Sequence, residues 1–225
     1  MPAEGAGLRA RVSPETAVRL EIYADLLRKW NPKINLVARS TLGEVWERHF
    51  ADSAQVLDVA APASGGLWVD LGSGGGFPGA VVAILAAEEV PDLDVVCVES
   101  DQRKAAFLRT VSRETSVPFE VISERIEVLD PFGADFLSAR ALAPLTDLLP
   151  HAERHLKTVG LALFPKGERH AEELAEAQNH WRFSVETATS STDPKAVIFK
   201  FGAVRRASVA DSPDHRRRQP EGRGR

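Results

Sequence analysis

The chain has 225 residues, 44% of them hydrophobic, and a formal net charge of −4. These values fit one large globular domain or a domain with an appendage, and they argue against a uniformly basic nucleic-acid binder. The first 13 residues contain no long apolar run, and no stretch approaches the ~20 apolar residues of a membrane span. One cysteine, Cys97, forms no internal disulfide or zinc site alone, so we predict no metal site and a cytoplasmic protein.

The charge is distributed unevenly along the chain. Residues 205–225 carry seven arginines and three acidic residues, a net charge of +4, which leaves −8 on the rest. A segment of this composition is typical of a disordered tail. Two roles remain open for it: contact with RNA phosphates, or solubilisation of the terminus without a specific partner.

The N-terminal quarter shows helix signals. Ser13–Pro14 is an N-cap followed by a proline suited to the first helical turn, and Asn31–Pro32 predicts the end of that helix. A capping box at 41–44 begins a second helix that should end near residue 59. We therefore predict a flexible segment at 1–13 and a helical extension at 14–62.

Short apolar runs then alternate with helical patterns, which is typical of an α/β fold with a parallel sheet covered by helices on both faces. The predicted strands are 67–71, 94–99, 118–122, 135–139 and 160–165. The predicted helices are 78–88, 101–115, 145–156 and 168–180. Two more strand-like runs, "FSVETAT" and "AVIFKFGAV", have no helix between them and predict a closing antiparallel pair. This domain should span 63–204.

A glycine-rich turn follows the first predicted strand. Its residues 74–79 match the pattern G-x-G-x-x-G of dinucleotide sites, but glycine-rich strand-to-helix turns are common. Asp70, at the strand end, would repel a pyrophosphate and attract a cation such as a sulfonium. Glu99, at the end of the next strand, is placed to accept hydrogen bonds from ribose hydroxyls. Together they favour S-adenosylmethionine over NAD.

Structural alternatives remain for each candidate residue. Asp70 is also placed to cap a turn or the next helix, and Glu99 to cap the helix near residue 101. Ile126 and Glu127, at the rim of the third strand, are candidates for contact with the adenine, although Ile126 also suits the core. Arg140, after the fourth strand, is a cleft residue or a structural ion-pair partner.

Several segments occur in the order found in one bacterial family. They are "NLVARSTLGEVWERHFADS", "VDLGSGGGFPG", "VESDQRKAAFLR", "ISERIE", "DFLSARALAPL" and "LFPKG". With them, residues 15–203 resemble the glucose-inhibited division protein B (RsmG) family, small-subunit 16S ribosomal RNA guanine-N7 methyltransferases. The usual "LKG" of the family is "FPKG" here, so the backbone at Pro165 is expected to differ.

The resemblance implies a class I S-adenosylmethionine-dependent methyltransferase (Rossmann-like) fold with an N-terminal helical extension. It implies an RNA substrate. The negative charge of the main body favours a small-subunit particle over naked RNA, the short apolar runs predict no membrane partner, and we expect a monomer. By similarity, the cofactor contacts are Gly72, Phe77, Ile126, Glu127 and Arg140. The cofactor shell is expected to be completed by Asp70, Ser73, Gly74, Gly76 and Glu99.

The chemistry implied by the resemblance needs no general base, because guanine N7 already has a free lone pair. Arg140 and Lys166 are expected to position the substrate. His49 and Asp52 either shape the RNA side of the cleft or, for His49, pack the second helix against the sheet. Other functions left open are a methyltransferase for a small molecule or protein, an NAD-binding oxidoreductase, and a non-catalytic RNA-binding assembly factor.

Overall fold

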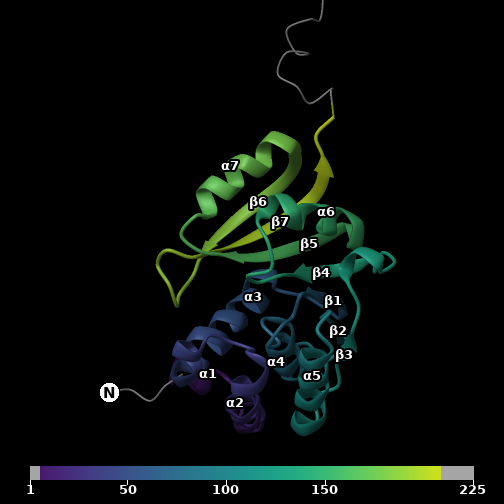
Figure 1. Ribbon diagram of the computed structural model, residues 1–225. Helices are drawn as coiled ribbons and strands as arrows, with labels where there is room; N and C mark the ends of the chain where they lie inside the picture. The colour runs from purple at the N-terminus through teal and green to yellow at the C-terminus, as the bar shows by residue number, and fades with distance from the viewer. Residues whose placement is uncertain (1–5, 209–225) are drawn as a thin grey trace, which may run out of the picture.

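The computed structural model describes residues 6–208, which form a seven-stranded sheet with helices on both faces (Figure 1). The strands are β1 (Gly66–Leu71), β2 (Leu93–Val98), β3 (Glu120–Ile122), β4 (Ala134–Ser138), β5 (Leu156–Lys166), β6 (Trp181–Thr189) and β7 (Val197–Arg206). The α-helices are α1 (Ala6–Arg11), α2 (Pro14–Ile34), α3 (Asp52–Ala60), α4 (Gly79–Glu89), α5 (Gln102–Thr115), α6 (Leu145–His155) and α7 (His170–His180). Three short helical segments are η1 (Arg39–Glu44), η2 (Trp46–Ala51) and η3 (Ile126–Val128).

The strand order is β3-β2-β1-β4-β5-β7-β6. Strands β1 to β5 pair in parallel, whereas β7 is antiparallel to both β5 and β6. The predicted α/β class, the parallel sheet and the closing antiparallel pair are therefore confirmed. The chain crosses from one side of β1 to the other between β3 and β4, and ligands of such sheets bind at the carboxyl ends of the strands beside this switch point.

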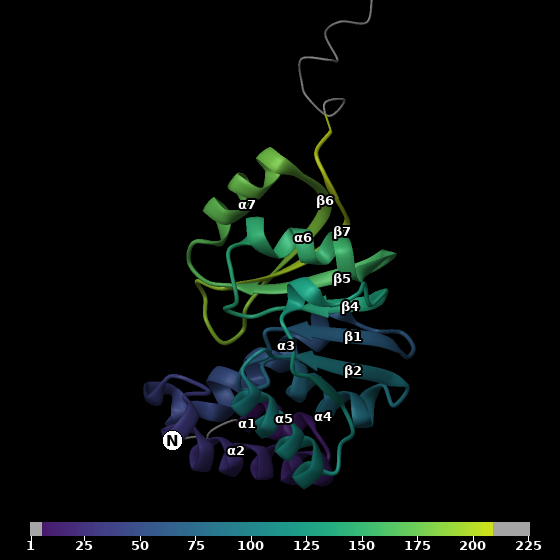
Figure 2. The same cartoon turned by 45° about the vertical axis from the view of Figure 1, so that its right-hand side comes forward.

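Each face of the sheet has its own hydrophobic core. On one face, α2, α3, α4 and α5 bury a cluster that includes Tyr23, Trp46 and Phe107. On the other face, α6 and α7 cover a cluster that includes Leu149 and Phe164. Figures 1 and 2 show these two helical layers on opposite sides of the sheet. No helix within residues 6–208 combines the length and apolar character of a transmembrane segment.

The N-terminal region differs from the sequence prediction. Residues 6–11, expected to be flexible, form α1, because Leu8 is buried and the Arg9 guanidinium lies 3.7 Å from the centroid of the Trp46 ring. Helix α2 continues through Pro32 to Ile34. Its end is stabilised by Asn31, whose side chain accepts hydrogen bonds from the two backbone amides of residues 36 and 37 at 2.7 and 2.9 Å.

The second predicted helix is three segments. The 3₁₀ segment η1 is followed by the π-helical segment η2 and then by α3. A π-helical turn holds an extra residue and rotates the side chains that follow it. In this protein the irregular segment carries His49, and Asp52 begins α3 directly after it, so both lie near the end of β4.

The predicted tail begins too early. Arg205 and Arg206 belong to β7, where they pair with Arg182 and Trp181 of β6. The Arg206 guanidinium also lies 5.1 Å from the centroid of the Trp181 ring, which favours an ordered strand end. The rest of the predicted tail, residues 209–225, lies outside the described residues.

Candidate active site

Asp70 stabilises the glycine-rich turn through hydrogen bonds of its buried carboxylate. Its carboxylate is fully buried and accepts hydrogen bonds from the Ser138 hydroxyl at 2.6 Å and from the Gly79 amide at 3.2 Å. A side chain at position 79 could not fit, because its Cβ would lie 2.6 Å from the Asp70 Cβ. Asp70 therefore caps α4 and ties it to β4, which is the structural alternative that the sequence left open.

Burial raises the pKa of Asp70 from 3.8 to about 6, although its hydrogen bonds act in the opposite direction. Between these two pH values the folded protein retains a proton that the unfolded chain has lost. The contribution of Asp70 to the free energy of unfolding should therefore fall by about 3 kcal/mol as pH rises through this window.

Urea unfolding of the wild type and of Asp70→Asn across this window tests that expectation. Because asparagine does not ionise, the stability of the wild type relative to the variant should fall from pH 4 to pH 6. A difference between the two proteins that stays constant with pH would contradict it.

A cleft of about 410 Å³ opens at the carboxyl ends of β1 and β2, and we call it the glycine-turn cleft. Five of the sequence-predicted cofactor residues line it: Gly72, Gly74, Glu99, Ile126 and Glu127. The structure thus brings together residues from three separate strand ends. Ser73 and Gly76 belong to the same turn but do not line the cleft; the Ser73 hydroxyl donates a hydrogen bond to the carbonyl of residue 70 at 3.0 Å.

Glu99 is the buried carboxylate of the glycine-turn cleft, with 7% of its surface exposed. One oxygen accepts a hydrogen bond from the Gly74 amide at 2.8 Å, and the other accepts one from the Asp101 amide at 2.7 Å. A carboxylate offers about four acceptor positions, so two remain for hydroxyl groups. Asp101, and not Glu99, caps α5, since its side chain accepts from the amides of residues 103 and 104.

Phe77 and Arg140 lie together, but outside the glycine-turn cleft. The Phe77 ring is stacked between Tyr23 and His49, with centroid distances of 5.6 and 4.8 Å. The Arg140 guanidinium lies 4.8 Å from the Phe77 centroid. Both residues were predicted from the resemblance as cofactor contacts. Neither lines the glycine-turn cleft, and of the two only Arg140 lines the neighbouring cavity described below.

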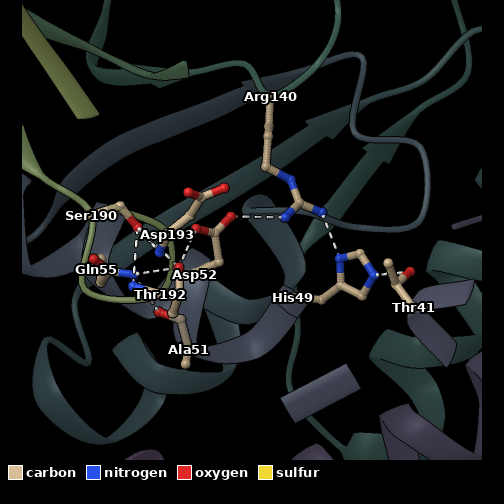
Figure 3. A network of polar contacts seen from close by, with 9 residues as sticks. All are labelled: Thr41, His49, Ala51, Asp52, Gln55, Arg140, Ser190, Thr192 and Asp193. Atoms are coloured by element: carbon tan, nitrogen blue, oxygen red, sulfur yellow. Dashed lines mark hydrogen bonds and ion pairs between the residues drawn. The ribbon is translucent and has the colours of Figure 1, made fainter. Parts of the chain in front are cut away.

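Arg140 joins three parts of the chain (Figure 3). It donates hydrogen bonds to the Asp52 carboxylate at 3.0 Å and to His49 Nδ1 at 3.2 Å. Asp52 in turn accepts from the Thr192 hydroxyl in the β6–β7 loop at 3.0 Å. Arg140 therefore makes the ion pair that the sequence left open as one alternative, and it also lines a cavity, as described below. Thr192 was not predicted from the sequence, because the loop has no periodic pattern.

His49 is neutral in this network. Burial is the main cause that lowers its pKa to about 3, and the charge of Arg140 acts in the same direction. Because Nδ1 accepts from Arg140, the proton lies on Nε2, which donates to the Thr41 hydroxyl at 2.8 Å. His49 is thus the hydrogen-bonded packing histidine of the sequence alternative.

A second cavity, of about 440 Å³, lies beside Arg140, and we call it the Arg140 cavity. Lys166 lines it, and its amine donates to the Ala143 carbonyl at 2.7 Å and pairs with Glu173 at 2.9 Å. Ala141 and Leu142 line both this cavity and the glycine-turn cleft. The two spaces are therefore neighbours across the loop that follows β4.

Comparisons with known proteins identify the family of this chain. The family model described as rRNA small subunit methyltransferase G matches residues 17–197. A ribosomal RNA small subunit methyltransferase G of Ruegeria pomeroyi is 58% identical over 195 residues, covering 87% of this chain and 95% of the relative. The protein of that name from Rhodospirillum centenum is 52% identical over 193 residues, covering 86% and 87%.

Solved structures show the same fold at low sequence identity. A mutant of MtNAS in complex with S-adenosylmethionine has a TM-score of 0.57 and 16% identity, covering 83% of this chain and 75% of that one. TYW2 of M. jannaschii in complex with AdoMet has a TM-score of 0.50 and 15% identity, covering 70% and 77%. The fold is that of class I S-adenosylmethionine-dependent methyltransferases, as the sequence predicted. The chain belongs to the rRNA small subunit methyltransferase G family.

Proposed function

We propose that this protein transfers a methyl group from S-adenosylmethionine to N7 of a guanine in 16S ribosomal RNA. The observation that carries the proposal is that the carboxylates of Asp70 and Glu99 have different roles. Asp70 caps α4, whereas Glu99 keeps free acceptor positions in the glycine-turn cleft. Family membership supplies the substrate class, since the relatives are named as ribosomal RNA methyltransferases.

This arrangement disfavours a dinucleotide. In dinucleotide sites the pyrophosphate binds the amides at a helix N-terminus. Here the Gly79 amide already donates to Asp70, and the Ala80 amide donates to the Gly76 carbonyl at 3.0 Å. The glycine-turn cleft holds three carboxylates and two cationic side chains, a formal charge of −1 that suits a sulfonium better than a pyrophosphate.

The glycine-turn cleft also fits an adenosyl group. Gly72 and Gly74 have φ values of +64° and +56°, and a Cβ on Gly72 would lie 2.6 Å from a Leu142 methyl group, so this turn excludes larger residues. We assign Glu99 to the ribose hydroxyls, and Ile126 and Glu127 to the base side of the same cleft.

The remaining predicted residues then act on the walls of the site. Asp70, Ser73 and Gly76 set the shape of the turn. Arg140 lines the Arg140 cavity and is supported by the buried Phe77 ring, and Lys166 holds the loop after β4 through its bond to the carbonyl of residue 143. These roles are positioning roles, since each polar group is already bonded to the protein.

The cofactor, when bound, supplies a methyl group on a positively charged sulfur. Guanine N7 carries its lone pair in the plane of the ring, so no proton has to leave before attack and the chain needs no general base. His49, neutral and bonded on both nitrogens, is consistent with this. The protein contributes alignment of the two reactants and the electrostatic environment of the transfer.

We further propose that the enzyme works as a cytoplasmic monomer on small-subunit particles. Outside residues 205–225 the chain carries a net charge of −8, which is unfavourable for tight binding of naked RNA. Comparable methylation rates on particles and on deproteinised 16S RNA would contradict the preference for particles.

The test is methyl transfer from labelled S-adenosylmethionine to small subunits isolated from a strain that lacks the gene. We expect label at N7 of one guanine of 16S RNA, located by nuclease digestion and mass spectrometry. Label in a protein or small-molecule fraction would indicate another methyltransferase, and calorimetric binding of NAD without S-adenosylmethionine would indicate an oxidoreductase.

A further inference from the structure

Among the described residues, four charged side chains of the Arg140 cavity form ion pairs with one another and two do not. Asp52 pairs with Arg140 at 3.0 Å, and Lys166 pairs with Glu173 at 2.9 Å. The two other charged residues that line the cavity are Arg48 and Asp193. The cavity thus offers one uncommitted cation and one uncommitted carboxylate to a ligand.

The contacts of these two residues confirm that they are available. Within residues 6–208, the Arg48 guanidinium has no hydrogen bond or ion pair. Asp193 accepts one hydrogen bond, from the Lys195 amide to Oδ1 at 3.0 Å, and its Oδ2 has no partner among the described residues. Every other charged side chain of this cavity makes an ion pair.

The loop that carries Asp193 is held in place. The Ser191 amide donates to the Gln55 side chain of α3 at 2.7 Å. The Thr192 hydroxyl donates to Asp52 at 3.0 Å (Figure 3). These bonds attach the β6–β7 loop to the elements that also hold Arg140. Asp193 is therefore preorganised at the cavity wall and loses little freedom when it binds a ligand.

We propose that the Arg140 cavity binds the target nucleotide, with Asp193 reading the guanine and Arg48 pairing with a phosphate. This inference rests on the proposed function and names the substrate contacts of its site. The Watson–Crick edge of guanine presents two donors, N1–H and N2–H, which a carboxylate accepts as a pair. Adenine presents an acceptor at N1, so the same carboxylate rejects it.

This binding mode leaves the reactive atom uncovered. N7 lies on the opposite edge of the purine from N1 and N2, so a guanine held by Asp193 keeps its N7 lone pair free. The cavity shares Leu142, a hydrophobic side chain with 39% of its surface exposed, with the glycine-turn cleft. A base in this cavity is therefore a neighbour of the cofactor cleft.

The carboxylate also favours the reaction itself. As the N7–methyl bond forms and the sulfur–methyl bond breaks, positive charge moves from the sulfur to the purine. The N1–H and N2–H groups become stronger donors, so their bonds to Asp193 strengthen in the transition state. Loss of the carboxylate should thus lower kcat as well as raise KM.

The first experiment measures methylation of small subunits by Asp193→Asn. Asparagine keeps the Oδ1 acceptor for the Lys195 amide, so the loop should keep its structure. We expect kcat/KM to fall by about 10- to 100-fold while the affinity for S-adenosylmethionine stays unchanged. The matched control is Asp94→Asn, at an exposed position near the amino end of β2, away from the carboxyl strand ends that carry both cavities, and it should behave as wild type.

The second experiment identifies the group that Asp193 reads. Small subunits reconstituted with inosine at the target lack the N2 amine, so the wild type should methylate them about 10-fold more slowly. Asp193→Asn should lose less activity on this substrate than on guanine, because inosine keeps only the N1–H of the donor pair. Independent, multiplying losses would overturn the assignment.

Arg48 is tested through binding. Arg48→Ala should weaken binding to the particle and reduce the slope of log affinity against log salt by about 1, without altering the preference for guanine. An unchanged salt slope would overturn its phosphate contact. Full activity of Asp193→Asn would overturn the guanine contact alone, whereas a wild type that methylates no RNA would overturn the proposed function.

Discussion

Replacing Glu99 with glutamine should weaken the binding of S-adenosylmethionine by about 100-fold. The substitution removes the charge and one acceptor from the carboxylate that we assign to the ribose hydroxyls. The lost hydrogen bond to a charged acceptor contributes about 1.5 to 3 kcal/mol, which covers this factor, since 1.4 kcal/mol is tenfold. Isothermal titration calorimetry measures the change directly.

The control for this variant is Glu120→Gln, at the exposed start of β3 and away from the glycine-turn cleft. It should bind the cofactor as the wild type does. Glu99 also accepts a hydrogen bond from the Gly74 amide. The variant should therefore lose about 1 kcal/mol of stability as well, which thermal unfolding detects. Wild-type cofactor affinity in Glu99→Gln would show that the ribose lies elsewhere.

The second large effect concerns the stability of the turn. Gly76 has φ of +93°, and a Cβ there would lie 2.2 Å from the Tyr23 hydroxyl oxygen and 2.9 Å from the Ala80 Cβ. Tyr23 cannot easily move, since it is fully buried and its hydroxyl donates to the Gly75 carbonyl. Gly76→Ala should therefore reduce the free energy of unfolding by about 2–6 kcal/mol, from backbone strain and overpacking together.

Urea unfolding at neutral pH measures this loss. The matched substitution is Gly43→Ala in η1, where a Cβ meets no atom within 4 Å, and its effect should stay within about 0.5 kcal/mol. In a Tyr23→Phe background Gly76→Ala should cost less, because the hydroxyl that it would strike is gone. Equal losses for Gly76→Ala and Gly43→Ala would contradict this account of the turn.

Much of the fold was predictable because its signals are local. The alternation of apolar runs and helical patterns placed β1, β2 and α4 within one or two residues of their bounds. Where the prediction was wrong, a tertiary contact outweighed the local sequence signal. Residues 6–11 are helical because Leu8 and Arg9 reach Trp46 and the core around it, and α2 passes Pro32 because Asn31 bonds the amides beyond it.

The candidate site divides in the same way. The sequence identified Glu99, Gly72 and Gly74 as cleft residues, since strand ends and glycine turns follow from the order of the elements. For Asp70 the sequence left two roles open, a ligand contact and a helix cap. Only the hydrogen bond from the Gly79 amide in the folded protein identifies it as a cap.

The sequence alone determined the order of strands and helices, the glycine-rich turn and the family, because these depend on neighbouring residues and on their spacing. The tertiary structure decided which charged groups are already paired. Arg140 donates a hydrogen bond to Asp52, which lies 88 residues away in the sequence, and Asp52 accepts one from Thr192, which lies 140 residues away. No local sequence pattern encodes either bond. The availability of Arg48 and Asp193 follows only from those pairings, because neither charge has an ion-pair partner within residues 6–208.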